Sequence, residues 1–346
     1  MVTVAAVAHS VPSACPQQDL WHEFFRTHYR GDPRAERIWH GTGVRTRHGV
    51  AIPPDLDVSG WGTGARMTLY GEAAVPLGKD AVAAALAAAG LRADEVGLLA
   101  VASCTGYVTP GLDILVARDL GMAPDVHRLL IGHMGCYAAL PGLGTVADFA
   151  RARGRPAVLL CVELPSLHVQ PAAPGRADLD QVVAHALFGD AAAAAVVTPD
   201  GPGFEVADLA AVTDTTASDH MTWDVTDHGF RMALSPRVPG VLARHIHRVV
   251  IGLLARHGLA QADISGWAVH PGGPRILDVV ANRLALPAGA LDTSREVLRE
   301  YGNCSSATAL LLLERLRPTL APGAHVVTLA FGPGLTLQAA LLRVTA

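Results

Sequence analysis

Residues 90–101, GLRADEVGLLAV, and residues 258–269, GLAQADISGWAV, decide the fold class of this chain. Each segment has a Gly-Leu helix end, an acidic residue and then an apolar run typical of a buried strand. The two copies begin 168 residues apart. A second pair, LFGDAAAAAVV (187–197) and AFGPGLTLQAALL (330–342), follows in the same order with an offset of 143 residues. The pattern predicts an internal duplication; chance matching of segments rich in alanine, valine and leucine is the alternative.

The rest of the chain alternates between helix and strand patterns. Helices are expected at Leu20–His28, Gly71–Ala89, Gly111–Leu120, Thr145–Arg153, Pro239–His257, Arg275–Leu284 and Ser305–Leu316. Strands are expected at Val2–Ala8, Leu98–Ala102, Ala157–Val162, Ala192–Val197, Gly266–His270, Val326–Phe331 and Leu337–Arg343. Buried strands that alternate with helices predict an α/β fold, with mainly parallel or mixed sheets covered on both faces.

A junction rich in proline and glycine separates the two expected halves. The segment TPDGPGFE (198–205) lies between an N-terminal half, residues 1–200, and a C-terminal half, residues 201–346. Two similar halves that face each other across a pseudo-twofold axis would bring equivalent strand ends together. We therefore expect functional residues from both halves to meet near that axis.

The composition limits the class of protein. Of 346 residues, 50% are hydrophobic and only 17% are charged, so we expect an oligomer that buries further surface. The net charge is −4 and there is no long basic run, which argues against a nucleic-acid partner. No stretch of 18 apolar residues occurs, so no membrane span is expected.

The cysteines and the N-terminus indicate a reducing, cytoplasmic compartment. The five cysteines are an odd number and form no C-x-x-C pair, which argues against a disulfide framework and a thiolate metal site. The first residues, MVTVAAVAHSVP, lack a basic segment and fit a first strand better than a signal peptide. Free thiols persist in such a compartment and are available for chemistry.

Cys136 is the candidate nucleophile. It follows the apolar run RLLIGHMG and precedes a helical segment, where the helix dipole lowers the pKa of a thiol. A nearby imidazolium would lower that pKa further, into a range of roughly 3.5–7.5. Pro141 lies where the second helical turn is expected, so the helix either kinks there or starts late. A buried structural cysteine is the alternative.

His270 and Asn303 are the candidate partners of that thiol. His270 ends the apolar run WAVH at a carboxyl strand end, where α/β sheets bind ligands, and a Pro-Gly-Gly segment follows it. Asn303 lies in a Gly-Asn turn, where helix capping is the alternative role. The repeat offset places Cys136 opposite Cys304, the neighbour of Asn303. A thiol, an imidazole and a carboxamide suit an enzyme that holds an acyl group and forms a carbanion.

The whole set of segments resembles a known family. The motifs GC, HPGG, GNCSSA and FGPG, together with IWHGTGVRTRH, SCTGYVTPG, ALFGD and RVPG, resemble in order and spacing the type III polyketide synthases. These are the chalcone synthase-like branch of the thiolase-fold condensing enzymes. The resemblance covers nearly the whole chain and implies a thiolase-like, duplicated αβαβα layered fold. Among members, the chain looks most similar to bacterial ones, notably in carrying Cys104.

The resemblance implies an acyltransferase that needs CoA thioesters as substrates and no cofactor or metal. Cys136 would hold an acyl starter taken from acyl-CoA or malonyl-CoA, while His270 and Asn303 would stabilise the enolate formed when malonyl-CoA loses CO₂. Repeated extension by two carbons and cyclisation would give an aromatic or pyrone polyketide. Enzymes of this kind form homodimers, and Thr109 falls where the family reaches across the dimer interface.

The resemblance also assigns roles around the catalytic residues. Phe188 matches the gatekeeper between the CoA tunnel and the cavity, although a core phenylalanine is the alternative. Arg45 and Arg47 are candidates for the CoA phosphates, against a solvated basic turn. The expected cavity lining is Cys104, His168, Trp223, Met232 and Ser305. Trp223 replaces a tyrosine of similar bacterial members, and YAALPGL after Cys136 lacks the family's glycines.

Two other functions share these residues. A 3-oxoacyl synthase of the fatty-acid initiating type uses the same three side chains for a single condensation with an acyl-carrier protein. A thiolase-fold protein without activity would only bind acyl-CoA. The intact Cys136, His270 and Asn303 set argues against the second, and the segments around Phe188 and His270 favour the polyketide synthase over the first.

Overall fold

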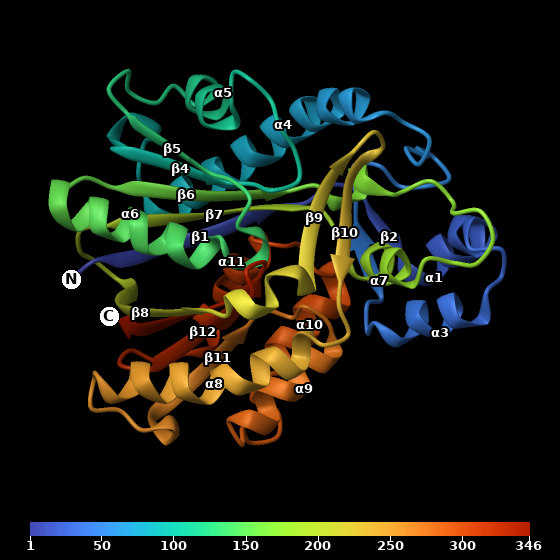
Figure 1. Ribbon diagram of the computed structural model, residues 1–346. Coiled ribbons are helices and arrows are strands. Elements are labelled where there is room, and N and C mark those ends of the chain that lie inside the picture. The colour runs from blue at the N-terminus through green and yellow to red at the C-terminus, as the bar shows by residue number, and fades with distance from the viewer.

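The computed structural model describes residues Met1–Ala346 and contains one nine-stranded mixed sheet (Figure 1). Its strands, in spatial order, are β11 (Ile264–Val269), β12 (His325–Gly332), β13 (Thr336–Thr345), β8 (Gly203–Thr213), β1 (Thr3–Ser10), β7 (Ala191–Thr198), β6 (Ala157–Glu163), β4 (Leu98–Ala102) and β5 (His127–Ile131). Strands β1 and β8 pair only through Thr3–Glu205 and Val4–Phe204. The sheet therefore divides there into an N-terminal half-sheet and a C-terminal half-sheet.

Helices cover both half-sheets and separate them. Helices α6 (Ala139–Arg153) and α11 (Ala307–Leu316) lie between the half-sheets and pack on strands of both (Figure 1). Helices α4 (Thr63–Ala89) and α5 (Leu112–Asp119) cover the outer face of the N-terminal half, while α8 (Val238–Ala255) and α9 (Pro274–Arg283) cover that of the C-terminal half. The layers therefore run α-β-α-β-α, as predicted.

The predicted offset reappears in the elements. Strand β6 begins at Ala157 and β12 at His325, and helix α6 begins at Ala139 and α11 at Ala307, so each pair is 168 residues apart. The last strand of each half, β7 and β13, pairs antiparallel with its neighbour, whereas β4 with β6 and β11 with β12 run parallel. The two halves thus repeat one arrangement, which supports the duplication over chance matching.

Smaller elements surround one end of the central layer. They are β2 (Ala14–Pro16), α1 (Gln17–Leu20), α2 (Arg26–His28), α3 (Pro33–Gly41), β3 (Thr46–His48), α7 (Leu179–Leu187), the β9 (Met221–Thr226) and β10 (Gly229–Leu234) hairpin, and α10 (Asp292–Tyr301). A π-helical turn, Trp21–Phe25, interrupts the helix expected at Leu20–His28. The strands β8, β9 and β10 and the helices α3, α7 and α10 were not predicted from the sequence, whereas β5 is the apolar run before Cys136. The three helices are only 9, 9 and 10 residues long, at or below the length at which a helix can be told from another short apolar segment.

Helix α8 is the one helix whose length and apolar composition would allow a membrane span. Eight of its residues, among them Ile246 and Leu253, are buried against the C-terminal half-sheet and α9. Its other face carries Arg244, His245 and Arg248. This one-sided burial is that of an amphipathic core helix.

Candidate active site

Cys136 lies in a one-turn helix, Gly135–Tyr137, directly before α6. Helix α6 begins at Ala139, so Pro141 falls in its first turn, where a backbone N–H has no partner within the helix to lose. The late start was one of the two predicted outcomes. Gly135 has φ +69°, and a Cβ there would lie 2.8 Å from Cδ of Pro333. The turn that carries the thiol therefore needs glycine.

Asn303 meets Cys136 from the other half of the chain. Its Oδ1 lies 4.0 Å from Sγ of Cys136 and accepts a hydrogen bond from the backbone N–H of Ser305 at 2.9 Å. Its own backbone is tied to the segment of Phe188, because its N–H donates to the carbonyl of Leu187 at 2.8 Å. The side chain caps a local turn and also faces the thiol, so the two predicted roles are compatible. No hydrogen bond within the chain uses the Nδ2 amino group.

His270 follows β11 directly and is almost completely buried, at 1% exposure. Its backbone N–H donates to the carbonyl of Leu329 in β12 at 2.8 Å, while neither ring nitrogen has a hydrogen-bond partner. Strand β12 ends at Gly332, where a Cβ would lie 3.1 Å from the carbonyl oxygen of Met134. Strand β12 therefore links the strand of His270 to the turn of Cys136.

Burial controls the protonation of both groups. It raises the pKa of the Cys136 thiol to about 12, although hydrogen bonds with Ser305 and Asn303 act in the opposite direction. It lowers the pKa of His270 to about 3, which keeps the imidazole neutral. The predicted lowering of the Cys136 pKa is therefore wrong, because desolvation outweighs the helix dipole and the neighbouring imidazole carries no charge.

A cavity of about 240 Å³ opens beside the thiol. Four of the five residues predicted for its lining, Cys104, Trp223, Met232 and Ser305, contact it together with Cys136 and the predicted gatekeeper Phe188, while His168 does not. His133, Met221 and Thr222 also line it and were not predicted, while Pro333 of the FGPG motif lines it as expected for a loop beside the cavity. Asn303 and His270 are not among the residues that line it.

His168 borders an adjoining channel that shares Phe188, Trp223 and Met232 with the cavity. Its Nε2 donates to the carbonyl of Thr105 at 2.7 Å, and its Nδ1 accepts from the N–H of Phe230 at 3.0 Å. Burial lowers its pKa to about 4. His168 is therefore a neutral ring held in one tautomer that supports Trp223 from behind, 5.8 Å between ring centroids.

The two candidate CoA-binding arginines differ in exposure. Arg45 is exposed to solvent. Arg47 is buried beneath the ring of Trp39, and its Nη1 donates to the carbonyls of His185 and Phe188. Arg47 thus supports the segment of Phe188, which leaves Arg45 as the cation of this turn that faces solvent.

Thr109 lies on the surface, away from the cavity of its own chain. Its hydroxyl donates to Oη of Tyr107 at 3.1 Å, and Tyr107 is 70% exposed. This position is compatible with the predicted contact across a dimer interface.

Glu163 is a buried acid beside the site that sequence reasoning missed. It ends β6 and accepts hydrogen bonds from Ser306 Oγ at 2.6 Å, Thr105 Oγ1 at 2.9 Å and the N–H of Cys104 at 3.1 Å. Burial raises its pKa, and these hydrogen bonds oppose the shift. The carboxylate thereby joins residues of both halves around the cavity. The available signal was an acidic residue at the end of the apolar run AVLLCVE, where burial demands hydrogen-bond partners.

Comparison with known proteins agrees with this geometry. The family model of the N-terminal domain of chalcone and stilbene synthases matches residues 1–201, and that of the C-terminal domain matches residues 210–346. A relative, 1,3,6,8-tetrahydroxynaphthalene synthase of Streptomyces peucetius subsp. caesius, is 38% identical over 320 residues, which are 89% of this chain and 82% of the relative.

Two further proteins extend the comparison. An alpha-pyrone synthesis polyketide synthase-like protein, Pks18, of Mycobacterium tuberculosis is 34% identical over 81% of this chain and 73% of its own. The crystal structure of 1,3,6,8-tetrahydroxynaphthalene synthase from Streptomyces coelicolor A3(2) superimposes with a TM-score of 0.92 at 29% identity and covers 99% of both chains.

Proposed function

This chain belongs to the chalcone and stilbene synthase family, the type III polyketide synthases, and we propose that Cys136 carries its growing polyketide. As a member it is an acyltransferase of thiolase-like fold that condenses malonyl-CoA units iteratively into aromatic or pyrone polyketides. The observation that carries the assignment is the contact, 4.0 Å, between Sγ of Cys136 and Oδ1 of Asn303 beside the cavity.

Loading begins at the thiol. Cys136 transfers its proton to the neutral imidazole of His270, and the sulfur attacks the carbonyl carbon of an acyl-CoA. The bond from that carbon to the CoA sulfur breaks, and CoA takes the proton from His270 and leaves as a thiol. Burial keeps the ring of His270 neutral at neutral pH, so it has a nitrogen lone pair for the proton, and the negative charge that forms on the sulfur stabilises the imidazolium.

Extension uses the same site. Malonyl-CoA loses CO₂, and His270 and the Nδ2 group of Asn303 donate hydrogen bonds to the oxygen of the resulting enolate. The enolate carbon attacks the thioester carbon on Cys136, whose sulfur leaves as a thiolate. One such donor contributes about 2.7–4 kcal/mol to the transition state. An imidazole and an amide suit the step, because each donates a hydrogen bond to the enolate oxygen without adding a negative charge of its own.

The surroundings supply binding and shape. Phe188 acts as gatekeeper between the cavity and the adjoining channel, and Cys104, Trp223, Met232 and Ser305 shape the space for chain growth, which supports a compact product. The exposed Arg45 pairs with a CoA phosphate. Malonyl-CoA serves as extender, and malonyl-CoA or another acyl-CoA serves as starter, without a cofactor or a metal ion.

The assembly is a homodimer in the cytoplasm. Each chain consists of the halves 1–200 and 201–346. Exposed apolar side chains on and near the edge strand β5, namely Tyr107, Ile114, Leu129 and Leu130, support an interface there, next to Thr109. Five free thiols support a reducing compartment.

The test combines product analysis with intact-protein mass spectrometry. The wild-type protein is incubated with isotope-labelled malonyl-CoA alone and then with added acyl-CoA starters. We expect products extended by several two-carbon units and an acyl adduct on Cys136. Replacing Cys136 with alanine is expected to remove both, while malonyl-CoA is still decarboxylated. Replacing Asn303 with alanine is expected to slow that decarboxylation by about 10²–10³-fold.

Cys161, a buried thiol of β6, is the control, and its alanine variant keeps the adduct and the products. Polyketide formation by the Cys136→Ala variant would refute the assignment. A single 3-oxoacyl product from the wild-type protein would favour the fatty-acid initiating alternative instead.

A further inference from the structure

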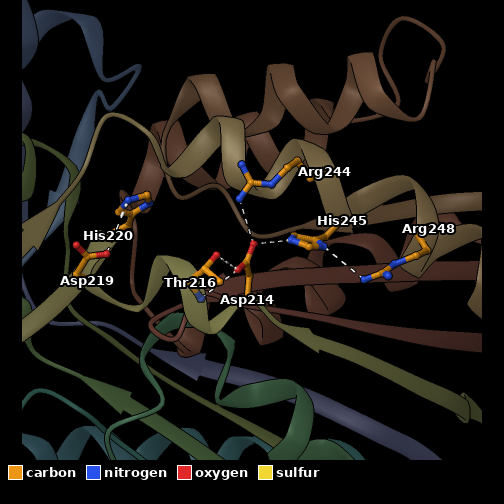
Figure 2. Close-up of polar contacts among 7 residues, drawn as sticks. All are labelled: Asp214, Thr216, Asp219, His220, Arg244, His245 and Arg248. Carbon is orange, nitrogen blue, oxygen red and sulfur yellow. Dashed lines mark hydrogen bonds and ion pairs between the residues drawn. The ribbon is translucent and has the colours of Figure 1, made fainter.

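A hydrogen-bonded cluster on the C-terminal half holds one carboxylate at the end of β8 (Figure 2). Oδ2 of Asp214 accepts from Nη2 of Arg244 at 3.1 Å and from Nε2 of His245 at 2.9 Å, both residues of α8. Oδ1 accepts from the hydroxyl of Thr216 at 2.5 Å and from its N–H at 3.2 Å. Arg248 in turn donates to Nδ1 of His245 at 3.5 Å.

The carboxylate is firmly held. The side chain of Asp214 is only 12% exposed, and hydrogen bonds from Thr216, His245 and Arg244 keep its pKa well below the usual range. It therefore stays ionised and bound to α8 at neutral pH. Because α8 is packed into the core along its whole length, the carboxylate is tied to a rigid element.

The backbone of Asp214 holds a second segment. Its N–H donates to the carbonyl of Leu335 at 2.9 Å, and the N–H of Leu335 donates back to the carbonyl of Asp214 at 3.0 Å. This pair extends the β8–β13 ladder by one residue beyond Thr213 and Thr336, whose hydroxyls also bond at 2.9 Å. Leu335 directly follows Gly332, Pro333 and Gly334, which we call the GPG loop.

The GPG loop touches the catalytic turn. Pro333 lines the cavity beside Cys136. A Cβ at Gly135 would lie 2.8 Å from Pro333, and a Cβ at Gly332 would lie 2.6 Å from the ring of Tyr137. A displacement of the loop by even half an ångström would therefore move the turn of the nucleophile or leave a gap beside it.

Asp214 also precedes the opposite wall of the cavity. The short helix Thr215–His220 follows it and leads into β9. The carbonyl of His220 accepts from the N–H of Ser235 at 2.8 Å, which closes the base of the β9–β10 hairpin. That hairpin carries Trp223 and Met232 into the cavity. One residue thus joins α8 to both walls.

We propose that Asp214, clamped by Arg244 and His245, is a positioning residue that holds the GPG loop and the β9–β10 hairpin around Cys136, and thereby sets the rate and the number of chain extensions. The effect on extension rests on the proposed function of Cys136. The clamp itself, which is the contact of Asp214 with Arg244 and His245, does not rest on that function, because it is a property of the fold.

The chain contains a matched control. Oδ2 of Asp208 accepts from Nε of Arg256 at 2.8 Å and from Nε2 of His257 at 3.0 Å. This cluster also joins β8 to the end of α8, and its carboxylate is 27% exposed. Asp208 lies six residues before Asp214, about 20 Å along the strand, and pairs with Leu341 rather than with the loop.

The first measurement is hydrogen–deuterium exchange on the variants Asp214→Asn and Asp208→Asn. In Asp214→Asn a side-chain NH₂ group replaces one carboxylate oxygen and cannot accept from both Arg244 and His245. The backbone N–H groups of Leu335 and of residues 215–223 are therefore expected to exchange about tenfold faster. Asp208→Asn leaves these amides unchanged. Equal exchange in the two variants, or no change in Asp214→Asn, overturns the clamp.

The second measurement is kinetic. We expect Asp214→Asn to lower kcat for polyketide formation about tenfold and to shift products toward fewer extensions, with KM for malonyl-CoA and single-turnover acylation of Cys136 within about twofold. Asp208→Asn is expected to match the wild-type protein. An unchanged product length and kcat in Asp214→Asn overturns the role in extension.

A pair of variants at His245 covers the case in which Asp214→Asn does not fold. Gln can still donate to Asp214, so His245→Gln is expected to keep the exchange pattern and the products, whereas His245→Ala loses both. Equal behaviour of the two counts against the proposal. An inactive wild-type protein would contradict the proposed function, while the exchange measurement would still decide the clamp.

Discussion

His168 and His270 are two buried, neutral imidazoles near one cavity, with different hydrogen bonding. Both ring nitrogens of His168 are used by backbone groups, while those of His270 have no partner. A satisfied ring supports structure, whereas an unsatisfied buried ring needs a further partner, such as a substrate or a water molecule. This contrast separates the supporting histidine from the proposed catalytic one more clearly than the sequence does.

His168 also makes the stability depend on pH. Its pKa is lowered from 6.5 to about 4 by burial, so the unfolded chain binds more protons than the folded one between these values. Stability from this group is complete above pH 6.5 and is lost as the pH falls toward 4. Between pH 7.5 and pH 5 the loss amounts to about 2 kcal/mol.

The amide of glutamine can both donate to Thr105 and accept from Phe230, as the histidine ring does. Between pH 7.5 and pH 5 we therefore expect the free energy of unfolding to fall by about 2 kcal/mol less in His168→Gln than in the wild-type protein. Urea denaturation at the two pH values measures the difference. The exposed His127, replaced by glutamine, serves as control. An identical pH dependence in His168→Gln and the wild-type protein would contradict the assignment.

At the scale of elements, the contact between the one-turn helix of Cys136 and the end of β12 sets the shape of the site. Gly135 adopts φ +69° there and leaves no space for a Cβ beside Pro333. Gly154, at the end of α6, has a similar φ of +63° but open space around it. The two glycines share a conformational requirement and differ in packing.

This pair gives a test of the packing. Gly135→Ala and Gly154→Ala should each lower the free energy of unfolding by about 1 kcal/mol, because alanine is strained at a positive φ. Gly135→Ala should lose a further 1–3 kcal/mol or so, because Pro333 or the catalytic turn must shift, and its kcat should fall at least about tenfold. Denaturant unfolding and steady-state kinetics measure both. Equal losses in the two variants would show that the contact is not needed.

Some elements were predictable and some were not. The strands that enter the buried layers, such as β4, β6 and β11, and the helix α11 have strong patterns and lie close to their predicted ranges, whereas α4 begins at Thr63, eight residues before its predicted start at Gly71. The β9–β10 hairpin is partly exposed, so its apolar period is weak, and it was missed, whereas the apolar run that forms the edge strand β5 was recognised. The hairpin still supplies Trp223 and Met232 to the cavity, which the family resemblance alone had indicated.

At the scale of the whole molecule, strand β5 forms an exposed edge of the sheet where a second chain can bind. Strand β5 has unpaired backbone groups on one side, and its Leu130 is 54% exposed. Exposed, apolar edge strands are sites of association unless they are covered. Tyr107 and Thr109 lie on the neighbouring surface loop, where the proposed dimer would bring them against a second chain.

We expect the wild-type protein to sediment at twice the 36.0 kDa of one chain, and Leu130→Glu to shift it to the monomer with a dissociation constant raised at least about 100-fold. Val225→Glu is the control, because Val225 is 72% exposed on the β9 strand, away from β5. Analytical ultracentrifugation separates the outcomes. A monomeric wild-type protein, or a dimer unaffected by Leu130→Glu, would refute the interface.

The sequence by itself determined the duplication and the alternation of strands and helices, and it indicated Cys136, His270 and Asn303 as candidate catalytic residues, because these depend on local pattern and on motifs with a fixed order. Only the tertiary structure decided their protonation, the buried position of Arg47, the presence of Glu163 at the site and the link from Asp214 to the GPG loop. The reason is physical: desolvation and hydrogen bonding depend on which distant segments exclude water from a group, and no local pattern of residues records that.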